Sequence, residues 1–259
     1  MRTVVGASQS SSRTSKMKHS IVVGGSGGIG RAVVELFARR ACVSVIGRHA
    51  VPGCHASSRV RHRIAEITDP DGVDAALRSS VDELGPPSHL VFLQRYRGDA
   101  DPWQGELQTS LSGTRQVIEA CAGLFPARGD HSIVVVSSIA AEFVADQPLG
   151  YHVAKAGLRQ MVRYYAVTLG RQRIRVNSVS PYTVLKATSR DYYLKNKRLQ
   201  ALYREIIPLG RMGTAEDVAN VIGFLCSPAA KFVTGQDIII DGGLSLLLQE
   251  PLMRQLSGV

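Results

Sequence analysis

Short apolar runs alternate with amphipathic stretches along most of the chain. The apolar runs, which are typical of buried strands, span residues 21–23, 42–46, 60–67, 89–93, 132–136, 174–179 and 236–240. Between them, apolar positions at helical spacing predict helices over residues 31–40, 72–84, 103–125, 151–169 and 214–225. Because strands that alternate with helices form parallel sheets, the pattern predicts one α/β domain, with a doubly wound, seven-stranded parallel sheet and helices on both faces.

A glycine-rich turn joins the first predicted strand to the first predicted helix. It reads Gly24-Gly25-Ser26-Gly27-Gly28-Ile29-Gly30. In such a turn, backbone N–H groups and the N-terminus of a helix face a pyrophosphate, which is how a Rossmann fold binds a dinucleotide. Its place between a strand and a helix therefore predicts a dinucleotide site.

The residue at the end of the second predicted strand bears on the choice of cofactor. An acidic residue there would bind the ribose hydroxyls of NAD, whereas a basic residue suits the 2′-phosphate of NADP. This chain has Gly47 and Arg48 at that point, and an arginine can donate two hydrogen bonds to a phosphate. We therefore expect NADP(H), and NAD(H) stays open if Arg48 is simply an exposed loop residue.

Tyr151 and Lys155 are four residues apart in a predicted helix, which places their side chains on one face, one turn apart. An ammonium beside a phenol favours the phenolate, and such a phenol can exchange a proton with a carbonyl or alcohol oxygen. Ser138, close behind the apolar run 132–136, could donate a hydrogen bond to the same oxygen. The spacing also occurs by chance on many helices, so the other motifs have to decide between the two interpretations.

Composition and charge narrow the class of protein. Of the 259 residues, 44% are hydrophobic and 20% are charged, as in ordinary globular domains. A net charge of +10 suits a partner that carries phosphate or other negative charge. No apolar run approaches the roughly 18 residues that a membrane span needs. Four scattered cysteines without a CxxC pair indicate reduced thiols, a cytoplasmic protein and no metal site.

Residues 1–18 are rich in Ser, Arg and Lys and contain no acidic residue. We expect them to be disordered, as a native or targeting leader or as residues added for expression, since Met17 lies just before the first predicted strand. Residues 19–259 are expected to form the single dinucleotide-binding domain.

Further motifs follow the helix of Tyr151. One is the segment Arg175-Val176-Asn177-Ser178-Val179-Ser180-Pro181, and the others are Pro208-Leu209-Gly210-Arg211-Met212-Gly213, Glu216-Asp217-Val218-Ala219, Thr234-Gly235 and Asp241-Gly242-Gly243. Together with the glycine-rich turn and the set Ser138, Tyr151 and Lys155, they stand in the order and at the spacing of the short-chain dehydrogenase/reductase family. The chain resembles that family over residues 20–245, and it is similar to 3-oxoacyl-carrier-protein reductases in its C-terminal third.

The resemblance implies a role for each matching residue. Tyr151 would be the general acid in reduction or the base in oxidation, Lys155 would hold the nicotinamide ribose, and Ser138 would orient the carbonyl. Ser110 stands where the family has a fourth catalytic residue, an asparagine, and could still place a water. The residues expected at the cofactor are Gly24, Ser26, Gly28, Ile29, Gly30, Arg48, Glu66, Ile67, Tyr151, Lys155 and Pro181.

The chain departs from the family pattern beside the expected nicotinamide site. Where the family has Asn-Asn-Ala-Gly, with small residues that let the cofactor approach, this chain has Phe92-Leu93-Gln94-Arg95. Either the backbone shifts there or the Gln94 and Arg95 side chains point away. Val23 replaces a threonine that bonds to the same region, and Glu66 replaces an aspartate beside the adenine.

Residues 182–207 are expected to form the substrate lid. Its basic residues are Lys186, Arg190, Lys195, Lys197, Arg198 and Arg204. With Arg95 and Arg97 they could face an anionic or carrier-bound substrate, or they could form a solvated helix face. Basic residues interleaved with tyrosines also bind single-stranded nucleic acid, but a complete redox site beneath them makes that role unexpected.

The combined expectation is an NADPH-dependent oxidoreductase that reduces a ketone to a secondary alcohol, with hydride from the cofactor and a proton from Tyr151. An NAD-dependent alcohol dehydrogenase and a cofactor-binding regulatory protein with weakened catalysis are the alternatives. The expected partners are a small ketone or alcohol and further copies of the chain. The family implies a homodimer or homotetramer formed through the helices predicted at 103–125 and 151–169.

Overall fold

A computed structural model describes residues 17–49, 58–185 and 190–257. The expected disordered leader lies outside these ranges except for Met17 and Lys18, and Lys18 is already the first residue of a strand. None of the described helices is long and apolar enough to cross a membrane. Within the same ranges, no three His, Cys, Asp or Glu side chains are grouped closely enough to hold a metal ion.

Seven parallel strands form the central sheet in the order β3-β2-β1-β4-β5-β6-β9. Their bounds are β1 Lys18–Val23, β2 Ala41–Gly47, β3 Val60–Ile64, β4 His89–Phe92, β5 His131–Val136, β6 Ile174–Pro181 and β9 Asp237–Ile240. The chain builds the sheet outward from β1 to β3 and then returns to add β4 on the other side of β1. In sheets of this kind, ligands bind at the carboxyl ends of the strands where the order reverses.

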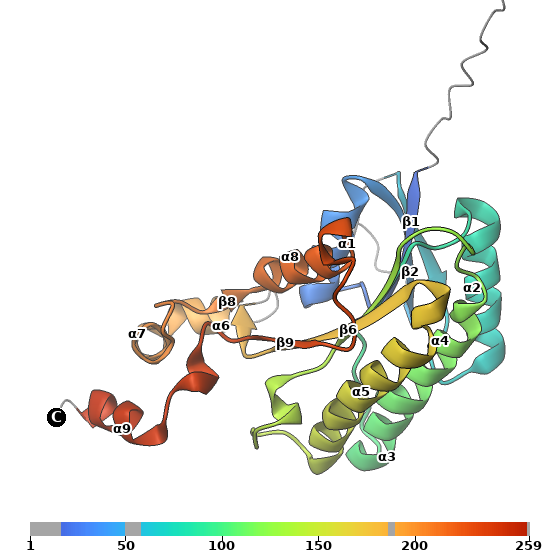
Figure 1. The fold of residues 1–259 in the computed structure, drawn as a ribbon. Coiled ribbons are helices and arrows are strands. Elements are labelled where there is room, and N and C mark those ends of the chain that lie inside the picture. Colours follow the sequence, from blue (N-terminus) through green and yellow to red (C-terminus); the bar gives the residue numbers. More distant parts are fainter. Residues whose placement is uncertain (1–16, 50–57, 186–189, 258–259) are drawn as a thin grey trace, which may run out of the picture.

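Helices cover both faces of the sheet, as the alternating pattern predicts (Figure 1). The helices are α1 Gly28–Ala38, α2 Pro70–Leu84, α3 Pro102–Glu106, α4 Gly113–Ala122, α5 Leu149–Thr168, α6 Arg190–Lys195, α7 Lys197–Ile206, α8 Ala215–Leu225 and α9 Gln249–Ser257. One hydrophobic cluster joins α1 and α8 to the sheet, and a second joins α2, α4 and α5 to its other face. Successive strand residues alternate between them, so Leu90 lies in one cluster and Val91 in the other.

Several boundaries differ from the sequence-based expectation. The third strand ends at Ile64 rather than at residue 67, because the chain turns there toward Asp69, whose carboxylate caps α2. The expected helix at 103–125 is α3 and α4 joined by a π-helical segment, Leu107–Ser112. Helix α9 and a small second sheet, β7 Val184–Leu185 with β8 Gly213–Thr214, were not expected. Periodicity does not reveal these features, because each depends on contacts with distant parts of the chain.

Three buried histidines lie at the amino ends of neighbouring strands. The imidazole of His89 is within 2.9 Å of the Ser20 hydroxyl and packs 5.8 Å from the Phe37 ring. Burial lowers the pKa of His89 to about 4, helped by the nearby charges of Lys18 and Arg175. Burial also lowers the pKa values of His19 and His131. The folded protein therefore holds these imidazoles neutral at a pH where the unfolded chain would protonate them.

Acid should weaken the fold through His89. Above pH 6.5 neither state protonates it, so its contribution to the free energy of unfolding is then constant. As the pH falls from 6.5 toward 4, the unfolded chain gains a proton that the folded protein does not, which costs roughly 3 kcal/mol over the whole interval. Urea unfolding at several pH values should therefore show a shallower fall for His89→Gln than for the wild type. His49→Gln, at an exposed position, is the control, and equal slopes for His89→Gln and the wild type would contradict the assignment.

Candidate active site

The glycine-rich turn is packed against the end of β4 at the point where the strand order reverses. Gly24 has a φ of +83°, and a Cβ there would lie 2.7 Å from the backbone nitrogen of Gln94. A Cβ on Gly30 would lie 2.4 Å from the Gly24 carbonyl oxygen. Both positions therefore require glycine, because α1 and the end of β4 approach the turn this closely.

The N-terminus of α1 is suited to an anion. The helix begins at Gly28, and no side chain caps it at Gly27 or places an acid in its first turn. Among the residues that the structure describes, none would lie within 4 Å of a Cβ on Gly27, so none of them fills the space in front of the turn. Open space, uncapped backbone N–H groups and the helix dipole together fit the pyrophosphate of a dinucleotide.

The residues expected at the adenosine end lie together. Arg48 follows β2, Glu66 follows β3, and the Arg48 Nε lies 3.9 Å from a Glu66 carboxylate oxygen, with both side chains about half exposed. An exposed contact of this length is weak, so the guanidinium can turn to a phosphate. Ile67 is buried, and its backbone N–H donates to Glu66 Oε1 at 3.0 Å.

Helix α5 brings Tyr151 and Lys155 to the carboxyl end of β5. Lys155 is only 3% exposed, and its Nζ donates to the Val136 carbonyl at 3.0 Å. The same Nζ lies 5.5 Å from the centre of the Tyr151 ring. The Ser137 hydroxyl donates to the Lys155 carbonyl at 2.9 Å, which joins α5 to the end of the strand. Among the described residues, the Tyr151 hydroxyl has no hydrogen-bond partner, so it is available to a substrate oxygen.

Ser138 lies directly after this strand end and caps a short 3-10 turn, Ile139–Ala141, that packs on α5. Its Oγ accepts from the Ala140 N–H at 3.2 Å, which leaves the hydroxyl hydrogen for a substrate oxygen. The structure thus puts Ser138, Tyr151 and Lys155 around the end of β5. Pro181 is the last residue of the neighbouring strand, β6, and is buried there.

Ser110 is fully buried in the π-helical segment, which packs against α5. Its hydroxyl donates to Glu106 Oε2 at 2.7 Å, and Glu106 is itself only 3% exposed. The hydroxyl therefore binds Glu106 rather than any of the three catalytic candidates, and a catalytic role for Ser110 stays a prediction. Sequence analysis missed Glu106, although an acid four residues before Ser110 in a helical pattern was a signal that could have found it.

The side chains of Gln94 and Arg95, the bulky residues after β4, point in different directions. The Gln94 amide donates to the buried Thr114 hydroxyl at 2.7 Å, which directs its side chain toward α4. The Arg95 guanidinium carbon lies 5.1 Å from the centre of the Tyr151 ring, and the group also binds Gln147 at 3.3 Å. The Gln94 side chain thus points toward α4, whereas Arg95 reaches the Tyr151 ring, so only Gln94 fits the alternative in which the side chain points away. Arg95 thereby joins the catalytic group, which sequence analysis did not foresee.

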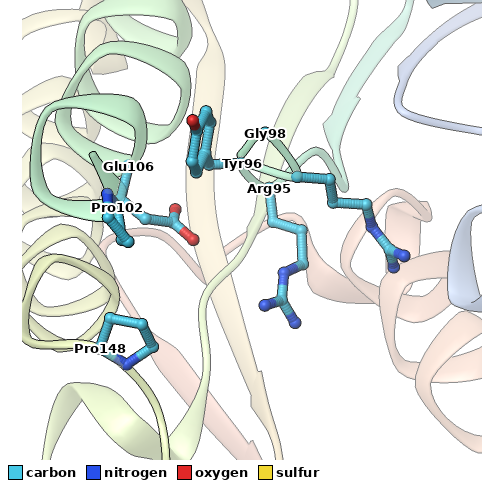
Figure 2. Close-up of a pocket in the computed structure, with 7 residues that line it drawn as sticks. Arg95, Tyr96, Gly98, Pro102, Glu106 and Pro148 are labelled. Atoms are coloured by element: carbon cyan, nitrogen blue, oxygen red, sulfur yellow. The ribbon is translucent and has the colours of Figure 1, made fainter. Parts of the chain in front are cut away.

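A cavity of about 300 Å³ opens beside this group. It is lined by Arg95, Tyr96, Arg97, Gly98, Pro102, Glu106 and Pro148. Figure 2 shows the Glu106 carboxylate reaching from α3 toward the side of Arg95.

The expected lid is formed by α6 and α7, which are joined by a hydrogen bond of 2.9 Å from Gln200 to the Tyr193 carbonyl. The rings of Tyr193 and Tyr203 lie 6.0 Å apart, and burial raises the pKa of Tyr203 to about 12. The described basic side chains, those of Lys195, Lys197, Arg198 and Arg204, are all exposed. Lys186 and the side chain of Arg190 lie outside the described residues.

Known proteins match this chain over nearly its whole length. The family model described as enoyl-(acyl carrier protein) reductase matches residues 24–245. A 3-oxoacyl-[acyl-carrier-protein] reductase of Thermotoga maritima is 30% identical over 247 residues, which cover 88% of this chain and 97% of the relative. A tropinone reductase homologue of Arabidopsis thaliana is 29% identical over 260 residues, which cover 94% and 97%.

Solved structures also match the fold of this chain. The solved structure of a short-chain type dehydrogenase/reductase from Mycobacterium ulcerans, 29% identical in sequence, matches with a TM-score of 0.79 and covers 88% of this chain and 90% of the other. With the glycine turn at the strand-order reversal and Tyr151 beside Lys155 on α5, these matches show that the chain belongs to the short-chain dehydrogenase/reductase family of oxidoreductases.

Proposed function

We propose that the protein reduces a ketone to a secondary alcohol with NADPH. The observation that carries the proposal is the environment of Tyr151, whose ring centre lies 5.5 Å from the Lys155 ammonium and 5.1 Å from the Arg95 guanidinium carbon. Two cations beside the ring can stabilise the negative charge that develops on the phenol oxygen during proton transfer. The uncommitted hydroxyl is then a suitable general acid for a carbonyl oxygen.

The residues of the chain divide the work of the reaction. A dihydronicotinamide cofactor, held at the glycine-rich turn and by Lys155, would supply a hydride for the carbonyl carbon. Ser138 donates a hydrogen bond to the carbonyl oxygen, and Tyr151 transfers its hydroxyl proton to the same oxygen. Lys155 and Arg95 stabilise the resulting phenolate until solvent returns a proton. One ketone, one NADPH and one proton thus give one alcohol and one NADP⁺.

Arg48 supports NADPH over NADH. It is exposed at the end of β2, and its contact with Glu66 is long enough to be exchanged for a phosphate. A charge-assisted pair with a 2′-phosphate is worth about 1.5–3 kcal/mol, which corresponds to roughly ten- to a hundredfold in affinity.

The proposal does not require a charge on the ketone. The sequence favours an anionic or carrier-bound substrate because the lid is basic, but the described basic side chains of α6 and α7 point into solvent. This exposure supports the alternative of a solvated helix face.

We also propose that copies of the chain pair through α5. Its outward face exposes Val153, Tyr164 and Val167. The second and third follow the first by 11 and 14 residues, so the three side chains lie on one side of the helix. An apolar stripe of this kind is what a self-association surface requires.

Replacing Tyr151 with phenylalanine should remove the acid and leave the cofactor site intact. We expect kcat for ketone reduction to fall about 10²- to 10⁴-fold, because proton transfer loses its donor. NADPH affinity, followed by fluorescence titration, should stay within about twofold. Tyr164→Phe, at an exposed position of the same helix, is the matched control. Full turnover by Tyr151→Phe would refute this mechanism.

Replacing Arg48 with glutamine should weaken NADPH and spare NADH. Titration of both cofactors should show a dissociation constant for NADPH raised roughly ten- to a hundredfold, with that for NADH nearly unchanged. Arg40→Gln removes an equal charge at an exposed position at the end of α1 and should alter neither. Equal effects of Arg48→Gln on the two cofactors would remove the basis for an NADP preference.

Placing a charge on the outer face of α5 should separate the copies. Val167 is 79% exposed in the single chain, so Val167→Glu should leave the fold intact while burying a carboxylate in the interface. Light scattering at micromolar concentration should show an oligomer for the wild type and a monomer for the variant. A monomeric wild type would overturn the assembly.

A further inference from the structure

The cavity beside Tyr151 contains a carboxylate that the proposed reaction does not use. Glu106 is only 3% exposed and lines this cavity of about 300 Å³. Its Oε2 accepts from Ser110, but its Oε1 has no hydrogen-bond donor among the residues that the structure describes. Oε1 is not among the buried side-chain atoms that lack a partner, so we take it to face the cavity, where a ligand can donate to it.

Arg95 brings a complementary group to the same space. Its guanidinium contacts the Tyr151 ring and lines the cavity with Glu106, yet the residue is exposed and can be reached from solvent. Figure 2 shows the Glu106 carboxylate extending toward the side of the cavity on which Arg95 lies. The cavity thus offers a hydrogen-bond acceptor and a donor, and Arg95 connects it to Tyr151, whose ring it contacts.

We propose that Glu106 and Arg95 form a substrate subsite that recognises a hydroxyl group next to the reacting carbonyl, so that the substrates are neutral hydroxyketones. A hydroxyl can donate to Glu106 Oε1 and accept from Arg95 at the same time, because one oxygen carries both a hydrogen and lone pairs. The inference rests on the proposed function, since the subsite is defined relative to Tyr151.

The charge of the cavity selects this class over an anion. A keto acid would gain Arg95 but would bring a second carboxylate toward the carboxylate of Glu106, and like charges repel. A plain ketone would fill the space but leave Glu106 Oε1 without a donor. Pro102 and Pro148 complete the wall on the side of Glu106, and they offer apolar contact to the carbon skeleton.

Matched ketones test the subsite. We would measure kcat/KM by NADPH oxidation for 3-hydroxy-2-butanone and 2-butanone, with 2-oxobutyrate and aminoacetone as the anionic and cationic probes. The wild type should favour the hydroxyketone over 2-butanone by about tenfold or more, the value of one charge-assisted hydrogen bond. Preference for 2-oxobutyrate or aminoacetone, or equal rates for the first two ketones, would overturn the inference.

Variants of Glu106 and Arg95 test whether these two residues cause the preference for the hydroxyketone. Glu106→Gln should reduce the ratio of kcat/KM for the hydroxyketone over 2-butanone severalfold, mainly through KM. Arg95→Gln should reduce the same ratio and should also lower kcat for both ketones, because Arg95 stabilises the phenolate. Glu119→Gln is the control, because Glu119 binds the Tyr165 hydroxyl away from the cavity and should leave the ratio unchanged. If Glu106→Gln does not fold, Glu106→Asp, which moves the carboxylate back, should lower the same ratio. A ratio unaffected by any variant at Glu106 would also refute the subsite.

The outcomes distinguish a failure of the subsite from a failure of the proposed function. Absence of NADPH oxidation with every ketone would refute the proposed function. Turnover without preference for the hydroxyl would refute only the subsite.

Discussion

The site depends on how α5 is fixed to the end of β5. Lys155 places a charged ammonium in the interior, where taking it out of water costs several kcal/mol, and the Val136 carbonyl is one group that offsets this cost. Ser137 joins the helix to the strand from the other direction through the Lys155 carbonyl. These two bonds set the height of α5 above the sheet and so the position of Tyr151. The dinucleotide crevice, the Arg95 contact and the neighbouring cavity are all arranged around that phenol.

Local signals predicted most of the fold and the central residues of the site. Val-rich runs and helical periodicity depend on neighbours in sequence, so the seven strands and the helices beside them could be found within a few residues. The spacing of Tyr151 and Lys155 is local too, and the family resemblance supplied Ser138. By contrast, the direction of Gln94 depends on Thr114, and the place of Arg95 depends on α5. Contacts between elements far apart in sequence have no local pattern, so the sequence could not predict the directions of these two side chains.

The unusual residues after β4 are mutually consistent in the structure. Leu93 still donates its backbone N–H to the Val23 carbonyl, so the loss of a threonine at position 23 leaves the strand pairing intact. The Gln94 side-chain amide donates to Thr114, which holds the side chain away from the glycine-rich turn. Arg95 is then the residue that reaches the catalytic phenol. The segment after β4 departs from the family pattern, yet each of these residues has a defined contact in the structure.

The buried histidines and the redox residues occupy opposite edges of one sheet. His89 titrates at the amino edge, whereas Tyr151 and Lys155 lie at the carboxyl edge. In acid, protonation of His89 weakens the fold from the end of the sheet that is remote from the site. Part of any fall in rate at low pH would then count molecules that have unfolded, so the folded fraction has to be measured beside the rate.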